Sequence, residues 1–96
     1  MHGEYKMPGG KLVVMDLEVR EGCLADVRLS GDFFLEPDSA LDTINRTLES
    51  LPAQADEATL ADAVQAALGP ETMMYGISPQ AIAVAVRRAL DGEVTA

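Results

Sequence analysis

The loop Gly9-Gly10-Lys11 contains the residues of this chain best suited to binding an anion. Glycine-rich loops let backbone amides and a lysine approach phosphate oxygens. However, no Ser or Thr follows the lysine, no spaced glycine precedes the loop, and a strand pattern rather than a helix follows it. A tight turn before a strand is therefore the favoured interpretation. With His2 and Lys6 nearby, this end is still the one suited to an anionic group.

The lone cysteine and histidine could in principle support catalysis. Cys23 could act as a nucleophile with His2 as its base. Cys23 is expected on the core face of a hairpin and His2 in a mobile terminus, so a buried structural thiol is the favoured interpretation. One Cys and one His cannot complete a zinc site. Two carboxylate pairs are interpreted as a solvated strand face and a helix cap rather than acid/base machinery: Asp16 with Glu18, and Asp56 with Glu57. We predict no catalytic residue and no metal ligand.

Two pairs of large apolar residues stand out in a chain with only four aromatic residues. Successive strand residues point to opposite faces, so one ring of Phe33-Phe34 can be buried while the other points outward. Two interpretations stay open: two core residues at a strand end, or an outward ring that anchors a partner. Met73-Met74 is interpreted as core filling.

Alternating apolar and polar residues predict a β-hairpin over about residues 11–34, and this hairpin must position the candidate residues. One face stays wholly apolar if Val19 lies opposite Cys23 and Leu17 opposite Ala25. This register implies the three-residue loop Arg20-Glu21-Gly22 with a left-handed glycine. We reject the two-residue loop Glu21-Gly22, because it would place Leu17 against Asp26.

The same register has consequences for both ends of the hairpin. It sets Asp16 against Asp26, an unfavourable pair. At the far end Leu12 faces Ser30, so the loop 8–11 and the segment 31–34 should lie side by side. Leu12 and Val14 then form an apolar patch on the face away from the core, where a cover is expected.

After Pro37 the apolar residues follow helical spacing, which predicts helices over about 37–51, 56–68 and 78–91. Asp56 and Ser78 are the expected caps of the second and third helices, and Asp38 or Glu36 that of the first. Residues 71–76 are a candidate short third strand. The fold class is therefore α+β, with a small antiparallel sheet packed by three helices.

Composition restricts the function further. Ninety-six residues predict a single domain, residues 1–96, and a net charge of −9 disfavours nucleic acid and anionic membranes as partners. A single cysteine rules out an internal disulfide and suits a reducing compartment. The chain shows no apolar run of membrane-spanning length and no signal-peptide pattern at its start, so we expect a cytoplasmic protein.

Several stretches together resemble the C-terminal accessory domain of bacterial and archaeal lipoate-protein ligases. The resemblance covers nearly the whole chain and runs through Gly3-Glu4-Tyr5-Lys6, residues 8–14, residues 30–38, Ser78-Pro79 and residues 83–90. In some members this domain is fused behind the catalytic domain, and in others it is a separate small subunit. The Met1 start and the lack of a catalytic region lead us to expect the separate form.

The resemblance implies a fold related to iron-sulfur scaffold and sulfur-acceptor proteins. It implies docking on a catalytic subunit that binds lipoate, ATP and Mg, and a role in forming lipoyl-adenylate rather than in lipoyl transfer. No cofactor of its own is expected. Lys6 and Lys11 are the candidates for facing the adenylate. We expect the partner interface to comprise Tyr5, Pro8, Gly9, Gly10, Lys11, Leu12, Val14, Asp32, Phe33, Phe34, Glu36 and Pro37.

Two other functions stay open. A sulfur-acceptor or iron-sulfur scaffold protein would need an exposed reactive thiol at Cys23. A protein-interaction adaptor unrelated to lipoate would bind a different partner and leave lipoate activation unchanged.

Overall fold

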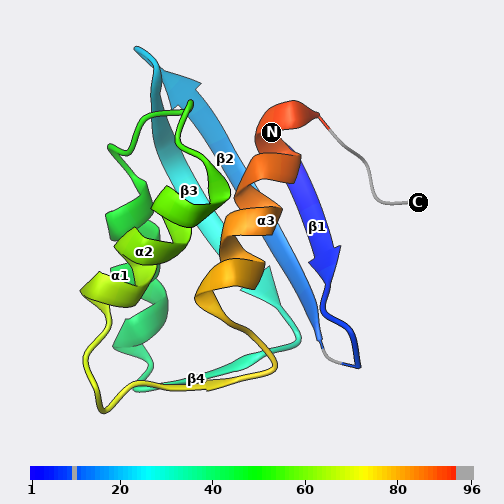
Figure 1. The fold of residues 1–96 in the computed structure, drawn as a ribbon, viewed down its shortest axis with the longest axis vertical. Helices are drawn as coiled ribbons and strands as arrows, with labels where there is room; N and C mark the ends of the chain where they lie inside the picture. The colour runs from blue at the N-terminus through cyan, green and yellow to red at the C-terminus, as the bar shows by residue number, and fades with distance from the viewer. Residues whose placement is uncertain (10, 93–96) are drawn as a thin grey trace.

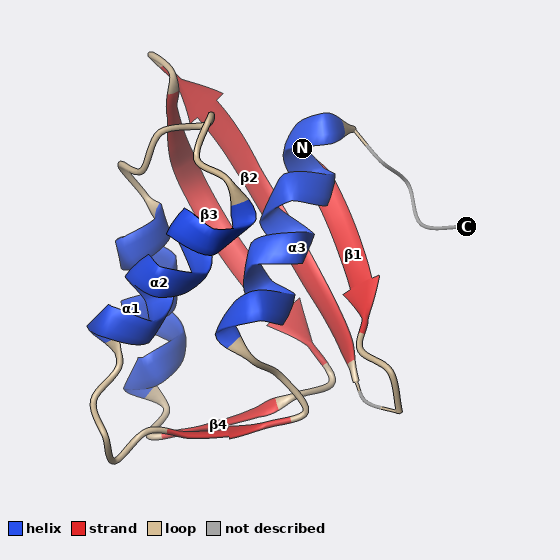
Figure 2. Ribbon diagram, in the orientation of Figure 1, coloured by secondary structure: helices blue, strands red, loops and turns tan. Residues whose placement is uncertain are grey.

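The computed structural model describes residues 1–9 and 11–92, which form two layers (Figures 1 and 2). A three-stranded antiparallel sheet has the order β1-β2-β3, and three helices cover one of its faces. β4 and β5 form a separate two-stranded antiparallel sheet. The predicted α+β class is confirmed. In chain order the elements are β1 (His2–Lys6), β2 (Leu12–Arg20), β3 (Cys23–Gly31), β4 (Phe34–Glu36), α1 (Ser39–Leu48), α2 (Glu57–Ala67), β5 (Met73–Tyr75) and α3 (Pro79–Asp91).

Strand β1 was not predicted, and the expectation of a mobile N-terminus is wrong. β1 pairs with β2 in an antiparallel register that places Tyr5 opposite Val13. Gly3 lies under α3, so closely that a β-carbon here would collide with the backbone of Ala85 and Ala89. A glycine adds nothing to a hydropathy pattern, so this contact with α3 left no periodic signal in the sequence.

The predicted three-residue hairpin loop is also wrong. Arg20 pairs directly with Cys23, which leaves a two-residue turn of Glu21 and Gly22. Both residues have positive φ, +53° and +79°, as a type I′ turn requires. This turn matches the right-handed twist of the two strands, which a pattern of apolar residues does not encode.

A β-bulge explains how the rejected turn keeps an apolar core face. Leu17 on β2 stands opposite both Asp26 and Val27 on β3, and Asp26 adopts a left-handed φ of +48°. With the two-residue turn and regular strands, Val27 and Leu29 would point away from the core. The extra residue at the bulge returns both side chains to the core face.

The bulge changes the partners of several predicted pairs. Leu24 is buried, while Cys23 and Ala25 are only half-buried, so their predicted place on the core face is wrong. Asp16 pairs with Arg28 instead of Asp26, and it is Val14, not Leu12, that faces Ser30. Asp26 forms an ion pair with Arg20. The unfavourable carboxylate pair is therefore absent.

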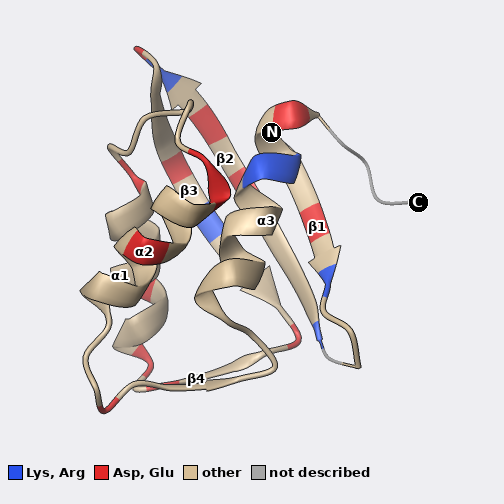
Figure 3. Ribbon diagram, in the orientation of Figure 1, with Lys and Arg blue, Asp and Glu red and all other residues tan. Residues whose placement is uncertain are grey.

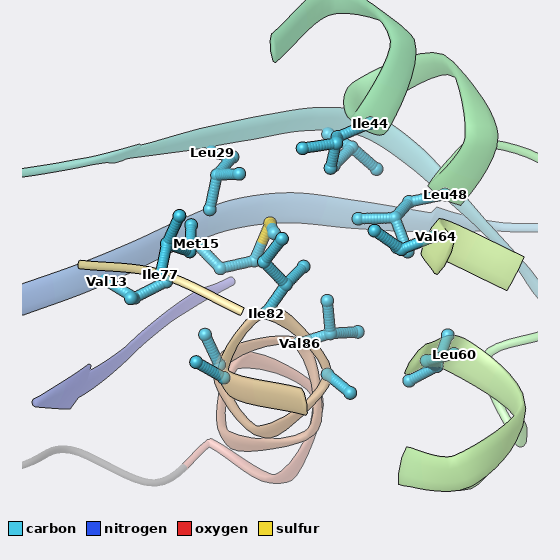
Figure 4. Close-up of a cluster of buried hydrophobic side chains, with 14 of the residues drawn as sticks. Val13, Met15, Leu29, Ile44, Leu48, Leu60, Val64, Ile77, Ile82 and Val86 are labelled. Carbon is cyan, nitrogen blue, oxygen red and sulfur yellow. The ribbon is translucent and has the colours of Figure 1, made fainter. Parts of the chain in front are cut away.

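The core lies between the sheet and the helices, with α3 beside both the sheet and α2 (Figure 4). The three helices lie within the predicted ranges, although α1 is shorter at both ends. Asp56 and Ser78 cap α2 and α3 by accepting hydrogen bonds from the amides of Thr59 and Ala81, whereas Asp38 makes no side-chain cap bond. The largest fully buried side chains are Met15, Ile44, Leu48, Leu60, Ile82, Val13, Val64 and Val86.

Residues of α1 and of the segment after it accept hydrogen bonds from backbone amides at the outer edge of β3. Asn45 Oδ1 accepts a hydrogen bond from the Leu29 amide at 3.1 Å, and a carboxylate oxygen of Glu49 accepts one from the Val27 amide at 3.1 Å. The Leu24 amide donates to the Leu51 carbonyl. These contacts occupy edge amides that an added strand would need. No helix within residues 1–9 and 11–92 is long and apolar enough to cross a membrane.

Candidate interaction surface

Two segments that the sequence analysis expected side by side do meet at one end of the sheet. The Asp32 amide donates a hydrogen bond to the Leu12 carbonyl at 3.1 Å. A β-carbon on Gly31 would collide with that same carbonyl and lie 3.0 Å from the Phe33 ring, so Gly31 permits a close approach. Pro8, Gly9 and Lys11 are exposed beside this junction, while Gly10 lies outside the described residues.

The β4–β5 ribbon separates the two adjacent phenylalanines. Phe33 packs partly buried against the core, whereas Phe34 is 53% exposed. Phe34 pairs across the ribbon with Tyr75, which is 48% exposed, and their ring centroids are 5.9 Å apart. Leu35 points to the opposite side and is buried. Phe33 and Phe34 are therefore not two core residues, because only Phe33 packs against the core while the Phe34 ring points outward.

Met73 shares the outward face of the ribbon. It pairs with Glu36 and is 47% exposed, so its interpretation as core filling is wrong. Its neighbour Met74 is half-buried against the core. Tyr75 and Met73 were missed as surface candidates. Strand alternation predicts that they share a face, but only the tertiary structure decides which face is exposed.

Lys11 extends this surface beyond Tyr75. A β-carbon on Gly76, whose φ is +75°, would collide with the Lys11 side chain, so the lysine lies directly against the residue after Tyr75. Lys6 is also exposed and pairs with Leu12 in the sheet. Among the described residues, no ion pair involves either lysine.

Tyr5, Leu12 and Val14 belong to the three-stranded sheet rather than to the β4–β5 ribbon. The Arg88 guanidinium lies 5.1 Å from the centroid of the Tyr5 ring and donates to the Glu4 carbonyl at 3.0 Å, so Tyr5 fastens β1 to α3. Leu12 and Val14 are half-buried on the sheet face that the helices leave uncovered. The expected interface residues therefore divide between the ribbon end and this open face.

His2 takes part in an ionic cluster rather than a catalytic pair with Cys23. Its two ring nitrogens lie 2.7 Å from carboxylate oxygens of Glu4 and Asp16. These two hydrogen bonds raise the pKa of His2 above its ordinary value, and the bond to Glu4 has the larger effect. Cys23 pairs with Arg20 at the end of β2, whereas His2 pairs with Asp16 nearer the middle of that strand, so the two residues are not paired with each other. The described part of the chain contains no group of three or more His, Cys, Asp or Glu side chains able to hold a metal ion.

The exposed lysines form one end of the candidate surface and carboxylates form the other. Figure 3 shows basic residues where β1 ends and β2 begins, and acidic residues where the ribbon leads into α1. Glu36, Pro37 and Asp38 are all exposed at this second end. The exposed apolar side chains of this surface lie between opposite charges and suit contact with another macromolecule.

Comparison with known proteins shows a likeness of fold alone. No family model matches the chain, and no curated protein matches it. Among solved structures, the fold is similar to a chain from an archaeal lipoylation system of Thermoplasma acidophilum, described as a bi-partite lipoate protein ligase and its lipoyl domain. The sequences are 20% identical, the TM-score is 0.69, and the match covers 91% of this chain and 98% of that chain. This likeness shows a shared fold.

Proposed function

We propose that this chain is a non-catalytic accessory subunit or domain of a lipoate-protein ligase. It docks on the catalytic subunit in the cytoplasm and supports the activation of lipoate to lipoyl-adenylate. The observation that carries the proposal is the match to a chain from a bi-partite ligase system over nearly the full length of both chains. The sequence resemblance to the accessory domain supports the same function.

The proposal assigns all bond-making to the partner. In the activation step the lipoate carboxylate attacks the α-phosphate of ATP, lipoyl-adenylate forms, and pyrophosphate leaves. Lipoate, ATP and Mg bind on the catalytic subunit, where Mg would offset the phosphate charge. This chain contributes contacts that favour the active arrangement of that subunit.

The activity test combines the purified chain with its cognate catalytic subunit, ATP and lipoate. We expect pyrophosphate release and lipoyl-adenylate formation to increase with added chain until a 1:1 complex is saturated. A step that starts from preformed lipoyl-adenylate and transfers lipoyl to an acceptor lysine should depend much less on the chain. Absence of both binding and stimulation would refute the proposed function.

Lys6 and Lys11 are the proposed adenylate-facing residues, because they are exposed cations without a carboxylate partner in the described structure. Lys11→Ala should lower the maximal rate of adenylate formation even when the chain saturates its partner. Lys6→Ala is the matched comparison, since both side chains are exposed at the same turn. An unchanged maximal rate for both variants would remove the lysines from the activation step.

A further inference from the structure

We propose that the outward face of the β4–β5 ribbon, made by Phe34, Met73 and Tyr75, is the contact surface for the catalytic subunit. We call these three residues the ribbon patch. This inference rests on the proposed function and gives it a specific docking element. Two of the three residues come from β5, a segment that the sequence resemblance did not single out.

The distribution of apolar exposure singles out the ribbon patch. Among the described residues, the large apolar side chains that stay exposed are the patch and Met1. Two of the four aromatic side chains of the protein lie in the patch, while the other two pack against the core. Aromatic and methionine side chains are enriched where protein surfaces meet. Three such neighbours on one ribbon face therefore indicate a contact surface.

The ribbon holds the patch in a defined position. A two-stranded sheet of three-residue strands is not stable alone, so its inward face must anchor it. Leu35 of β4 is buried in the core at 7% exposure, and Ile77, just after β5, is buried at 5% exposure. The Phe34 and Tyr75 rings also contact each other across the strands. Such a cross-strand pair stabilises the ribbon. Stability of the ribbon alone does not explain why Met73 is exposed or why a lysine lies beside Tyr75.

Opposite charges at the two ends of the patch determine the kind of partner that fits. Lys11 adjoins the Tyr75 end through Gly76, and Glu36 pairs with Met73 at the other end. In a chain of net charge −9, the lysine end is a local exception (Figure 3). A matching partner surface has an apolar centre, a negative region opposite Lys11, to which the bound adenylate would contribute, and a basic group opposite Glu36. This asymmetry would determine the orientation of the docked chain.

The test measures the affinity of the cognate catalytic subunit for variants of the full chain by calorimetry. Tyr75→Ser and Met73→Lys should each weaken binding about tenfold or more. Val14→Ser tests the open sheet face, which holds the other expected interface residues, and Ala66→Lys, at an exposed position of α2, is the control that should bind like the unchanged chain. Lys11→Glu should weaken binding more at low salt than at high salt. Thermal unfolding of each variant checks that it remains folded.

The possible outcomes separate this inference from the proposed function. If the unchanged chain binds and stimulates its partner but the patch variants bind equally well, the ribbon patch is refuted while the proposed function stands. If Val14→Ser alone weakens binding, the open sheet face is the interface and the patch is again refuted. If the unchanged chain neither binds nor stimulates the subunit, both proposals fail. Sedimentation of the chain alone measures self-association. If the patch variants abolish self-association but leave binding to the subunit unchanged, the patch is an interface between copies of this chain and the inference is overturned.

Discussion

Gly3→Ala should destabilise the domain, because α3 packs on β1 with no space for a side chain at this position. A β-carbon at Gly3 would lie 2.6 Å from the Ala85 carbonyl oxygen, 2.9 Å from Ala89 Cα and closer still to the Ala89 amide nitrogen. All three are backbone atoms of a helix whose inner face is buried. No change of side-chain rotamer can relieve this clash, so α3 and β1 must move apart.

The size of the effect follows from the cost of overpacking. Forcing an extra methylene-sized group into a packed core typically costs about 1–3 kcal/mol of unfolding free energy. In a domain of this length, 1 kcal/mol corresponds to roughly 4–8 °C in Tm. We therefore expect Gly3→Ala to lower Tm by roughly 4–24 °C. The lower part of this range applies if β1, an edge strand, can shift outward.

Gly69→Ala is the matched control for thermal unfolding followed by circular dichroism. A β-carbon there would meet only the carboxylate of Glu71, the mobile end of a flexible side chain. Its expected change in unfolding free energy is within about 0.5 kcal/mol. If Gly3→Ala proved as stable as Gly69→Ala, the close packing of α3 on β1 would be wrong.

Two further predictions concern polar contacts of the sheet. Glu4 and Asp16 raise the pKa of His2 in the folded state. The ion pairs of His2 should therefore stabilise the fold fully below pH about 6.5, the pKa of histidine in the unfolded chain. This contribution should disappear as the pH rises through the higher pKa of the folded state. An NMR titration of the His2 ring that gave an ordinary or lower pKa would contradict this, and His2→Gln should remove the pH-dependent difference in Tm. Asn45→Ala leaves the Leu29 amide without its acceptor and should cost about 1–3 kcal/mol in urea unfolding. Asn45→Asp retains an acceptor oxygen and should cost less; equal losses would argue against this hydrogen bond.

The helices were predictable because their signals are local. Asp56 and Ser78 cap α2 and α3 at positions where the residue types alone predicted a start. Apolar spacing of 3.6 residues identified the buried face, as Ile44, Ile82 and Val86 show. The predicted range 37–51 was too long for α1, because the residues after Leu48 turn to pair with β3.

The sheet was harder to predict, because its register depends on contacts between distant residues. A three-residue loop keeps one face apolar only if both strands are regular, and the bulge at Asp26 makes β3 irregular. β1 was missed because its inward residues are Gly3 and Tyr5, one without a side chain and one held by Arg88. Neither contact has a counterpart in a local hydropathy pattern.

The amino-acid sequence predicts the α+β class, the places where α2 and α3 begin, and the meeting of the start of β2 with the segment after β3. These follow from residue types and from spacing within one element or one hairpin. The shared exposed face of Phe34, Met73 and Tyr75, with Lys11 beside it, is visible only in the folded chain. The reason is physical: β4 and β5 are three-residue strands far apart in the chain, and which of their faces is buried depends on where the core lies.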